Sequence, residues 1–238
     1  FFGVLCGECR NVGFVDANVF SPDTGIGIIA GYVGLAAGAE NYTGKVINCY
    51  TSGVLKGSGA AGGIGGVLGG SGYIKNCYSS ATVIDQITNN TGKAGGIIGR
   101  VNGNANGSSI ENCYTSGDIS AIGGGNVGGI IGKVDNGKLV VKNCIAWNST
   151  LTSTDKTKVG RIVGGTANTT YENCYAHEGI ILKAGETTFT VSDETSPSGS
   201  SFQGVAKSAN ELKGTVINWD SSLWKEGSNG YPVFKWSK

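Results

Sequence analysis

The sequence predicts an all-β protein, a parallel β-helix (β-solenoid) of about six to seven coils followed by a small C-terminal aromatic cap. Glycine supplies 43 of the 238 residues. Because glycine in a helix interior costs about 1 kcal/mol relative to alanine, this composition excludes long helices. Two short β-like motifs also recur along the chain with a period of roughly 30 residues, which is typical of stacked repeat architectures.

The first motif has the pattern apolar-x-Asn-Cys followed by Tyr or Ile. Its copies begin at Val46, Ile74, Ile110, Val141 and Tyr171, and Asn11-Val12 marks a degenerate first copy. In a stack of coils, equivalent residues form columns because neighbouring strands lie about 4.8 Å apart. The residues before the asparagines alternate in charge from Lys75 to Glu172. This alternation favours the stacking, since opposite charges attract across adjacent strands.

Three columns of this motif supply candidate residues. The asparagines are expected to form a hydrogen-bonded ladder at a corner of the coil, and the cysteines a buried stack. The tyrosines are expected to pack as a ladder or, where they face outward, to stack on sugar rings. The ladder residues are Asn48, Asn76, Asn112, Asn143 and Asn173 with Cys49, Cys77, Cys113, Cys144 and Cys174, and the candidate ligand-binding residues are Tyr50, Tyr78, Tyr114 and Tyr175.

The second motif is rich in glycine and alternates with the first. Its clearest copies are Gly62–Leu68, Gly95–Val101 and Gly128–Val134, with weaker copies near Gly27, Gly160 and Phe1. Repeated glycines permit tight bends and a close approach of the backbone between coils. Each period is therefore expected to hold two short strands, joined by loops of variable length.

The repeat ends near Ile180, which divides the chain into a repeat domain (1–180) and a C-terminal segment (181–238). Residues 184–201 are rich in Ser, Thr and Gly and are expected to form a long loop. A capping box at Ser208–Glu211 predicts one short helix through Lys213. The aromatic residues that follow are expected to cover the open end of the solenoid, with a sugar-stacking site as the alternative: Trp219, Trp224, Tyr231 and Trp236.

Charge and motif content exclude several function classes. A formal net charge of +1 gives no field to recruit nucleic acid, and no stretch is predicted to span a membrane. The single histidine, His177, cannot complete repeated zinc sites, so no metal, cofactor or catalytic group is predicted. Cys6 and Cys9 are expected to form a local disulfide or to remain two capped thiols. Calcium binding near Asp85–Asn90 is left open.

The two motifs together resemble the GLUG-motif repeats of large bacterial secreted and surface proteins. These include some immunoglobulin-A proteases and many proteins of gut Bacteroidetes. The ending from Trp219 to Trp236 is similar to the segment that closes such arrays. The resemblance implies an extracellular or cell-surface module of a larger bacterial parent chain, and it transfers no catalytic residue.

From these observations we expect a non-enzymatic module that adheres to glycans or to host extracellular-matrix protein, or that serves as a spacer. The alternative is a carbohydrate-active enzyme on the same fold, either a polysaccharide lyase or a glycoside hydrolase. A cleft lined by clustered carboxylates would favour that alternative.

Overall fold

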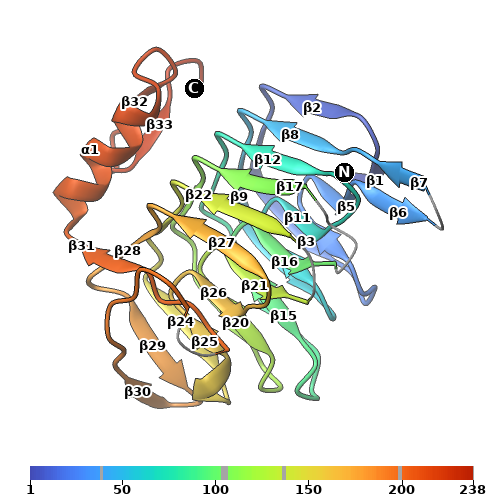
Figure 1. Ribbon diagram of the computed structural model, residues 1–238, viewed down its shortest axis with the longest axis vertical. Coiled ribbons are helices and arrows are strands. Elements are labelled where there is room, and N and C mark those ends of the chain that lie inside the picture. Colours follow the sequence, from blue (N-terminus) through green and yellow to red (C-terminus); the bar gives the residue numbers. More distant parts are fainter. Residues whose placement is uncertain (38–39, 103–106, 136–137, 198–199, 238) are drawn as a thin grey trace.

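The computed structural model describes residues 1–37, 40–102, 107–135, 138–197 and 200–237. It is a parallel β-solenoid of about six coils, in which strands from successive coils stack into four long sheets (Figure 1). The predicted fold class is confirmed, because parallel strands dominate, one short helix is present among the described residues, and aromatic residues cluster near the C-terminus.

The glycine-rich motif forms two of these sheets. One sheet has the order β1-β5-β11-β16-β21-β26 and contains β1 (Phe2–Leu5), β5 (Ala30–Val33), β11 (Gly65–Leu68), β16 (Ile98–Val101), β21 (Ile131–Val134) and β26 (Val163–Gly165). The second contains β4 (Ile26–Gly27), β10 (Ala61–Gly62), β15 (Lys93–Gly95), β20 (Asn126–Gly128) and β25 (Val159–Gly160), stacked in that order.

The Asn-Cys motif forms the other two sheets, one on each side of its asparagine. The sheet before the asparagine contains β2 (Glu8–Arg10), β8 (Lys45–Ile47), β12 (Tyr73–Lys75), β17 (Ser108–Glu111), β22 (Leu139–Lys142) and β27 (Thr169–Glu172). The 12-stranded sheet after it contains β3 (Gly13–Phe20), β9 (Tyr50–Gly57), β13 (Tyr78–Ser79), β14 (Thr82–Asp85), β18 (Tyr114–Thr115), β19 (Ile119–Ala121), β23 (Ile145–Ala146), β24 (Thr150–Ser153), β28 (Tyr175–His177), β29 (Ile181–Ala184), β30 (Thr187–Phe189) and β31 (Val205–Lys207).

The asparagine column turns the corner between these two sheets. Each asparagine has a left-handed backbone with φ between 50° and 57°, a conformation that asparagine tolerates better than most residues. From Asn48 onward, each side-chain amide donates a hydrogen bond to the amide oxygen of the asparagine in the preceding coil, at 2.9–3.2 Å. The ladder consists of Asn11, Asn48, Asn76, Asn112, Asn143 and Asn173, so the degenerate first copy at Asn11 also belongs to it.

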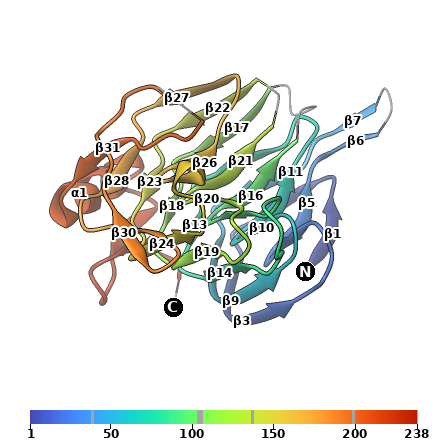
Figure 2. The ribbon, with the colours of Figure 1, turned by 90° about the horizontal axis from the view of Figure 1, so that it is seen from below.

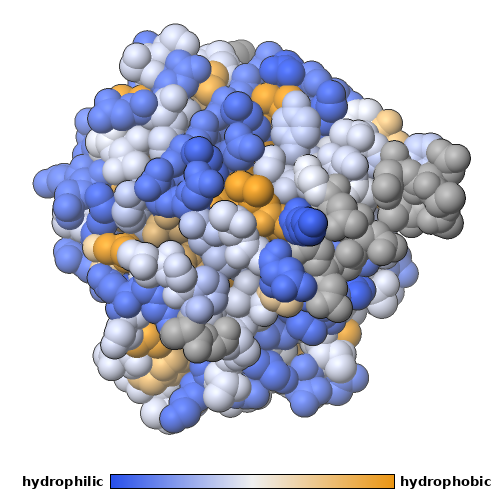
Figure 3. Space-filling model, viewed as in Figure 1, coloured by the Kyte–Doolittle hydropathy of each residue, from blue (hydrophilic) through white to orange (hydrophobic). Residues whose placement is uncertain are grey.

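The interior of the coils is filled by aliphatic side chains and by the cysteine column, and nearly all of them are buried. Glycine is required where the glycine-rich motif turns. A Cβ on Gly95 would lie 2.1 Å from the Ile98 carbonyl oxygen and 2.6 Å from the Gly132 nitrogen. Because the apolar side chains fill the interior, hydrophobic residues form only small separate patches on the face of the molecule seen in Figure 3.

The solenoid continues past residue 180, because β29 pairs in parallel with β24 and β31 pairs in parallel with β28. Residues 193–197 and 200–207 then cover the last coil. Phe202 is buried against Tyr171, with ring centroids 4.2 Å apart. The buried Arg161 donates to the carbonyl oxygens of Gln203 (3.1 Å) and Gly204 (2.8 Å) and to the Asp193 carboxylate (2.7 Å).

The last part of the chain runs back along one side of the solenoid (Figure 1). We call residues 208–237 the C-terminal clasp; it contains α1 (Ala209–Trp219), β32 (Trp224–Glu226) and β33 (Pro232–Phe234). The helix begins at the predicted capping box on Ser208 but continues past the predicted end at Lys213. The extension is stabilised by tertiary packing, because Leu212 and Val216 are buried against the solenoid.

Two smaller elements complete the chain. The hairpin of β6 (Leu35–Ala37) and β7 (Glu40–Tyr42) extends away from the body (Figure 2). A single 3-10 turn, η1 (Lys156–Lys158), precedes β25.

Candidate functional site

The tyrosine column lies on the side of the solenoid that faces the clasp. The rings of Tyr50 and Tyr78 stack with centroids 5.0 Å apart, and those of Tyr78 and Tyr114 with centroids 5.1 Å apart. Ile145 occupies the next position, so it separates Tyr175 from this stack.

Clasp residues cover the stacked tyrosines. Phe234 lies 5.3 Å from Tyr78 between ring centroids, and the Tyr114 hydroxyl donates to the Pro232 carbonyl oxygen. As a result Tyr78 is 7% exposed and Tyr114 is 1% exposed. Of the four candidate ligand-binding tyrosines, these two pack inside the molecule, and Tyr50 and Tyr175 are half-buried.

The expected position of the aromatic cap is corrected by this arrangement. Instead of closing the open end, the clasp aromatics pack along the side of the coils, and the end is covered by Phe202 and its neighbours. The tyrosine column explains the difference, since its stacked rings offer the clasp aromatics an apolar surface along the side of the coils. The clasp residues concerned are Trp219, Trp224, Tyr231 and Trp236.

A second outward column lies beside the tyrosines and was missed at the sequence level. Each of its members stands two residues after a member of the tyrosine column, and residues two apart in a strand share a face. Strand register and backbone hydrogen bonds align the column from coil to coil. Its members are Ser52, Ser80, Ser116, Trp147, His177 and Lys207.

Three hollows lie where the clasp meets this column, and Asn229 lines all of them. The first, of about 180 Å³, lies over the three serines. The second, of about 310 Å³, is lined by Trp147, His177 and Tyr231. The third, of about 460 Å³, lies between Tyr78 and residues 225–229. We call this continuous surface, lined by both columns and the clasp loop 227–233, the clasp groove.

In the part of the chain that the structure describes, the hollow over the serines has no charged lining residue, whereas Lys213 lines the second hollow and Lys225 and Glu226 line the third. Burial raises the pKa of the Tyr114 phenol well above its usual value, and the neighbouring Tyr78 adds to this effect. The hydroxyl therefore stays protonated and able to donate. At the edge of the groove, Lys213 pairs with Glu226 at 2.6 Å. The amino group of Lys207 lies 4.3 Å from the centroid of the Tyr175 ring, a cation–π contact.

The charged column before the asparagines serves stacking and lies away from the groove. Lys75 pairs with Glu111 at 3.8 Å, and Lys142 with Glu172 at 2.8 Å. On another sheet Asp135 accepts from Arg100 and Lys133. Burial alone would raise the pKa of this carboxyl group, but those two bonds hold it below its usual value.

The cysteine column holds free thiols inside the solenoid. Cys49, Cys77, Cys113, Cys144 and Cys174 are buried, and each thiol donates to the carbonyl oxygen two residues earlier, at 3.2–3.6 Å. Burial raises the pKa of the Cys113 and Cys174 thiols, which keeps them protonated and unreactive. Of the remaining pair, Cys6 is an exposed free thiol and Cys9 a buried one.

Glu226 is the one carboxylate among the described residues that line the clasp groove, so no carboxylate cluster is found there. Among the described residues, no group of three or more His, Cys, Asp or Glu side chains is placed to hold a metal ion. In the region considered for calcium, the buried Asp85 accepts from the backbone nitrogens of Ile87 (2.9 Å) and Lys93 (2.7 Å). Its carboxylate is therefore engaged by the loop that it organises.

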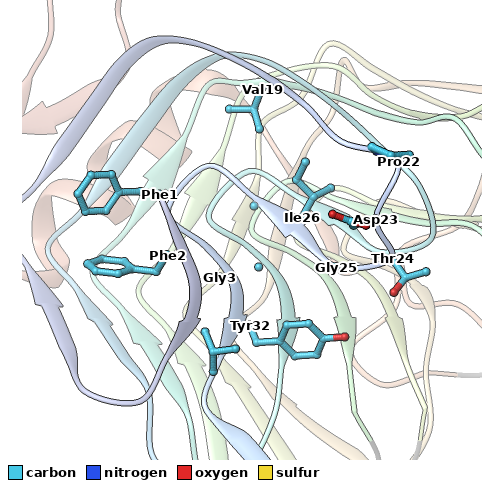
Figure 4. Close-up of a pocket in the computed structure, with 13 residues that line it drawn as sticks. Phe1, Phe2, Gly3, Val19, Pro22, Asp23, Thr24, Gly25, Ile26 and Tyr32 are labelled. Carbon is cyan, nitrogen blue, oxygen red and sulfur yellow. The ribbon is translucent and has the colours of Figure 1, made fainter.

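A larger hollow of about 570 Å³ lies at the N-terminal end of the solenoid (Figure 4). It sits over β4, the outermost strand of its sheet. Phe1 and Phe2 stand on one side, and Asp23 and Thr24 on the other. Its lining comes from the first coils, and the predicted site residues lie elsewhere.

The fold and the site together define a class: a parallel β-solenoid with a lateral groove that is completed by a C-terminal clasp. No family model and no curated protein matches the chain, so the resemblance to GLUG repeats rests on the motif residues. A solved structure from Bacteroides ovatus, described as a putative immunoglobulin A1 protease, matches all of the chain and 71% of its own length, with 53% identity and a TM-score of 0.92. The chain belongs to the family of this protein.

This comparison corrects the functional expectation. The prediction that the chain is not an enzyme is wrong, because a structure that matches it over its whole length is described as a putative immunoglobulin A1 protease. The prediction rested on the lack of a recognisable catalytic motif in the sequence. Within the described ranges, no helix has the length and apolar character needed to cross a membrane.

Proposed function

We propose that this chain acts in the proteolysis of immunoglobulin A1, as part of a secreted or surface-exposed bacterial protein, and that the clasp groove contacts the immunoglobulin. The observation that carries the proposal is the 53% identity, over the entire chain, to the Bacteroides ovatus protein described as a protease of this substrate.

The groove supports the second half of the proposal. It joins partly exposed aromatic rings, hydroxyl groups and amides over several coils, the composition expected of a recognition surface. Its walls come from residues far apart in the chain, with Tyr114 and Pro232 in direct contact. A rigid solenoid holds these groups in fixed positions, which reduces the ordering cost of binding.

Recognition of glycans or matrix protein, the role expected from the sequence, would use this same surface, so these partners belong in the same experiment. The purified protein is incubated with immunoglobulin A1, immunoglobulin G and matrix proteins. Gel electrophoresis then reports cleavage, and biolayer interferometry reports binding.

A matched pair of variants assigns the surface. Ser80→Arg places a long side chain in the groove, whereas Ser109→Arg makes the same change on β17, in a different sheet. We expect selective binding or cleavage of immunoglobulin A1 that Ser80→Arg weakens and Ser109→Arg preserves. If all the proteins are bound and cleaved equally, immunoglobulin A1 is not the specific substrate. If Ser80→Arg and Ser109→Arg have equal effects, the groove is not the contact surface.

A further inference from the structure

The lining of the clasp groove is uncharged where it crosses the serines. The hollow over Ser52, Ser80 and Ser116 is otherwise lined by tyrosines, valines and Asn229, with no Lys, Arg, His, Asp or Glu side chain. A charged ligand group placed there would lose its hydration without meeting a counter-charge, which is costly. The lining therefore favours a ligand that is polar but neutral.

Hydroxyl and amide groups in this hollow are available to a ligand. The hydroxyls of Ser80 and Ser116 make no hydrogen bond with another described residue, whereas the Ser52 hydroxyl accepts from the Asp16 nitrogen at 3.0 Å. Each hydroxyl both donates and accepts. The Asn229 side chain offers two N–H donors, whereas its carbonyl oxygen already accepts from the Tyr231 nitrogen at 3.2 Å. These pairings match a ligand that itself carries many hydroxyl groups.

Most of the groove floor offers a peptide backbone no free strand edge. Peptides commonly bind to a sheet by adding a strand to an exposed edge. The floor strands β9, β13, β18 and β23 are each paired with a neighbour on both sides. Among the described strands, β3, whose Val15 also lines the hollow, pairs only with β9, so a free strand edge borders the groove at that end. Over the other floor strands, contacts to a ligand must come from side chains.

Aromatic rings extend the groove beyond the serines. In the adjacent hollow, Tyr231 and His177 are half-buried, and the Trp147 ring lies 4.9 Å from Tyr231 between centroids. Rings that combine an apolar face with a polar edge suit ligands that alternate CH faces and hydroxyls. The groove thus offers hydroxyl and amide groups that can hydrogen-bond to sugar hydroxyls, and aromatic rings that can pack against the CH faces of a sugar.

From this combination we propose that the clasp groove binds a neutral oligosaccharide, and that the glycans of the immunoglobulin are the part of the substrate that it contacts. The second clause rests on the proposed function. The first depends only on the groove and holds equally for free sugars of the same chemistry.

The experiment uses the intact protein and three probes. These are immunoglobulin A1 with its glycans, the same immunoglobulin after enzymatic deglycosylation, and a panel of free neutral oligosaccharides. The variants are Ser116→Ala and Asn229→Ala in the groove, with Ser109→Ala on β17 as the control. Loss of one or two hydrogen bonds predicts binding about tenfold weaker for the groove variants, and unchanged binding for the control.

The outcomes separate this inference from the proposed function. Binding that deglycosylation and both groove variants weaken supports both. Equal binding of the intact and deglycosylated immunoglobulin overturns the glycan inference and leaves the proposed function standing. Binding of free oligosaccharides without any binding or cleavage of immunoglobulin supports the neutral sugar and overturns the substrate. No binding to any probe overturns both.

Discussion

Replacement of Asn112, in the middle of the asparagine ladder, tests the physical account of the corner. Its side chain donates to Asn76 at 3.0 Å and accepts from Asn143 at 2.9 Å. Asn112→Ala removes both bonds, at about 1 kcal/mol each. Alanine in the left-handed conformation (φ 52°) adds about 1 kcal/mol of strain, so the expected loss of unfolding free energy is about 3 kcal/mol.

Two companion variants separate these contributions. Asn112→Gly loses the same hydrogen bonds but adopts the left-handed backbone freely, so about 2 kcal/mol is expected. Asn173→Gly, at the exposed end of the ladder, removes only the 3.2 Å bond to Asn143 and is expected to cost about 1 kcal/mol or less.

Urea denaturation followed by circular dichroism gives the three values, provided that the slopes of the transitions agree. Equal losses for Asn112→Ala and Asn112→Gly would show that backbone strain contributes nothing. A loss for Asn112→Ala no greater than that for Asn173→Gly would refute the ladder as a source of stability.

Three further predictions concern the solenoid end, the tyrosines and the surface. Arg161→Ala, which removes the contacts to Gln203 and Gly204, should cost about 3 kcal/mol and expose residues 193–207 to limited proteolysis; an unchanged digestion pattern contradicts this. Because burial raises the pKa of Tyr114, the folded phenol stays protonated while the unfolded one ionises near pH 10. The urea midpoint of unfolding should therefore fall as the pH rises above about 10, and it should fall less in Tyr114→Phe. A midpoint that does not change with pH contradicts this. Lys142→Ala breaks an exposed ion pair, so urea denaturation should show only a small loss of stability that shrinks with added salt; a loss as large as that of Asn112→Gly contradicts this.

The coils could be predicted from the sequence because their rules are local and repeated. The asparagine column indicates a left-handed corner in each copy. The glycine column indicates a close backbone approach that a Cβ would block, as at Gly95. The boundary near Ile180 was less predictable. Strand β29 continues the stack without the motif, held by its pairing with β24 on one side and with β30 on the other.

The candidate site depends on contacts that no local rule contains. Tyr114 and Pro232 are 118 residues apart in the chain, so the pattern around either residue does not show that they meet. The serine column could have been found, because strand alternation places Ser80 two positions after Tyr78 on the same face. The proposed role in proteolysis could not be predicted, since the motifs that identify the fold carry no catalytic group.

The C-terminal clasp also sets an order of events during synthesis. Tyr50, Tyr78 and Tyr114 leave the ribosome well before Trp224 and Phe234, the residues that cover them. Early coils can stack while the rest of the chain is still being made, because each coil needs only its neighbour. Their tyrosine column must remain exposed to solvent until Phe234 has been synthesised. A nascent chain stalled before that point would expose an aromatic surface of the kind that chaperones bind and that promotes aggregation.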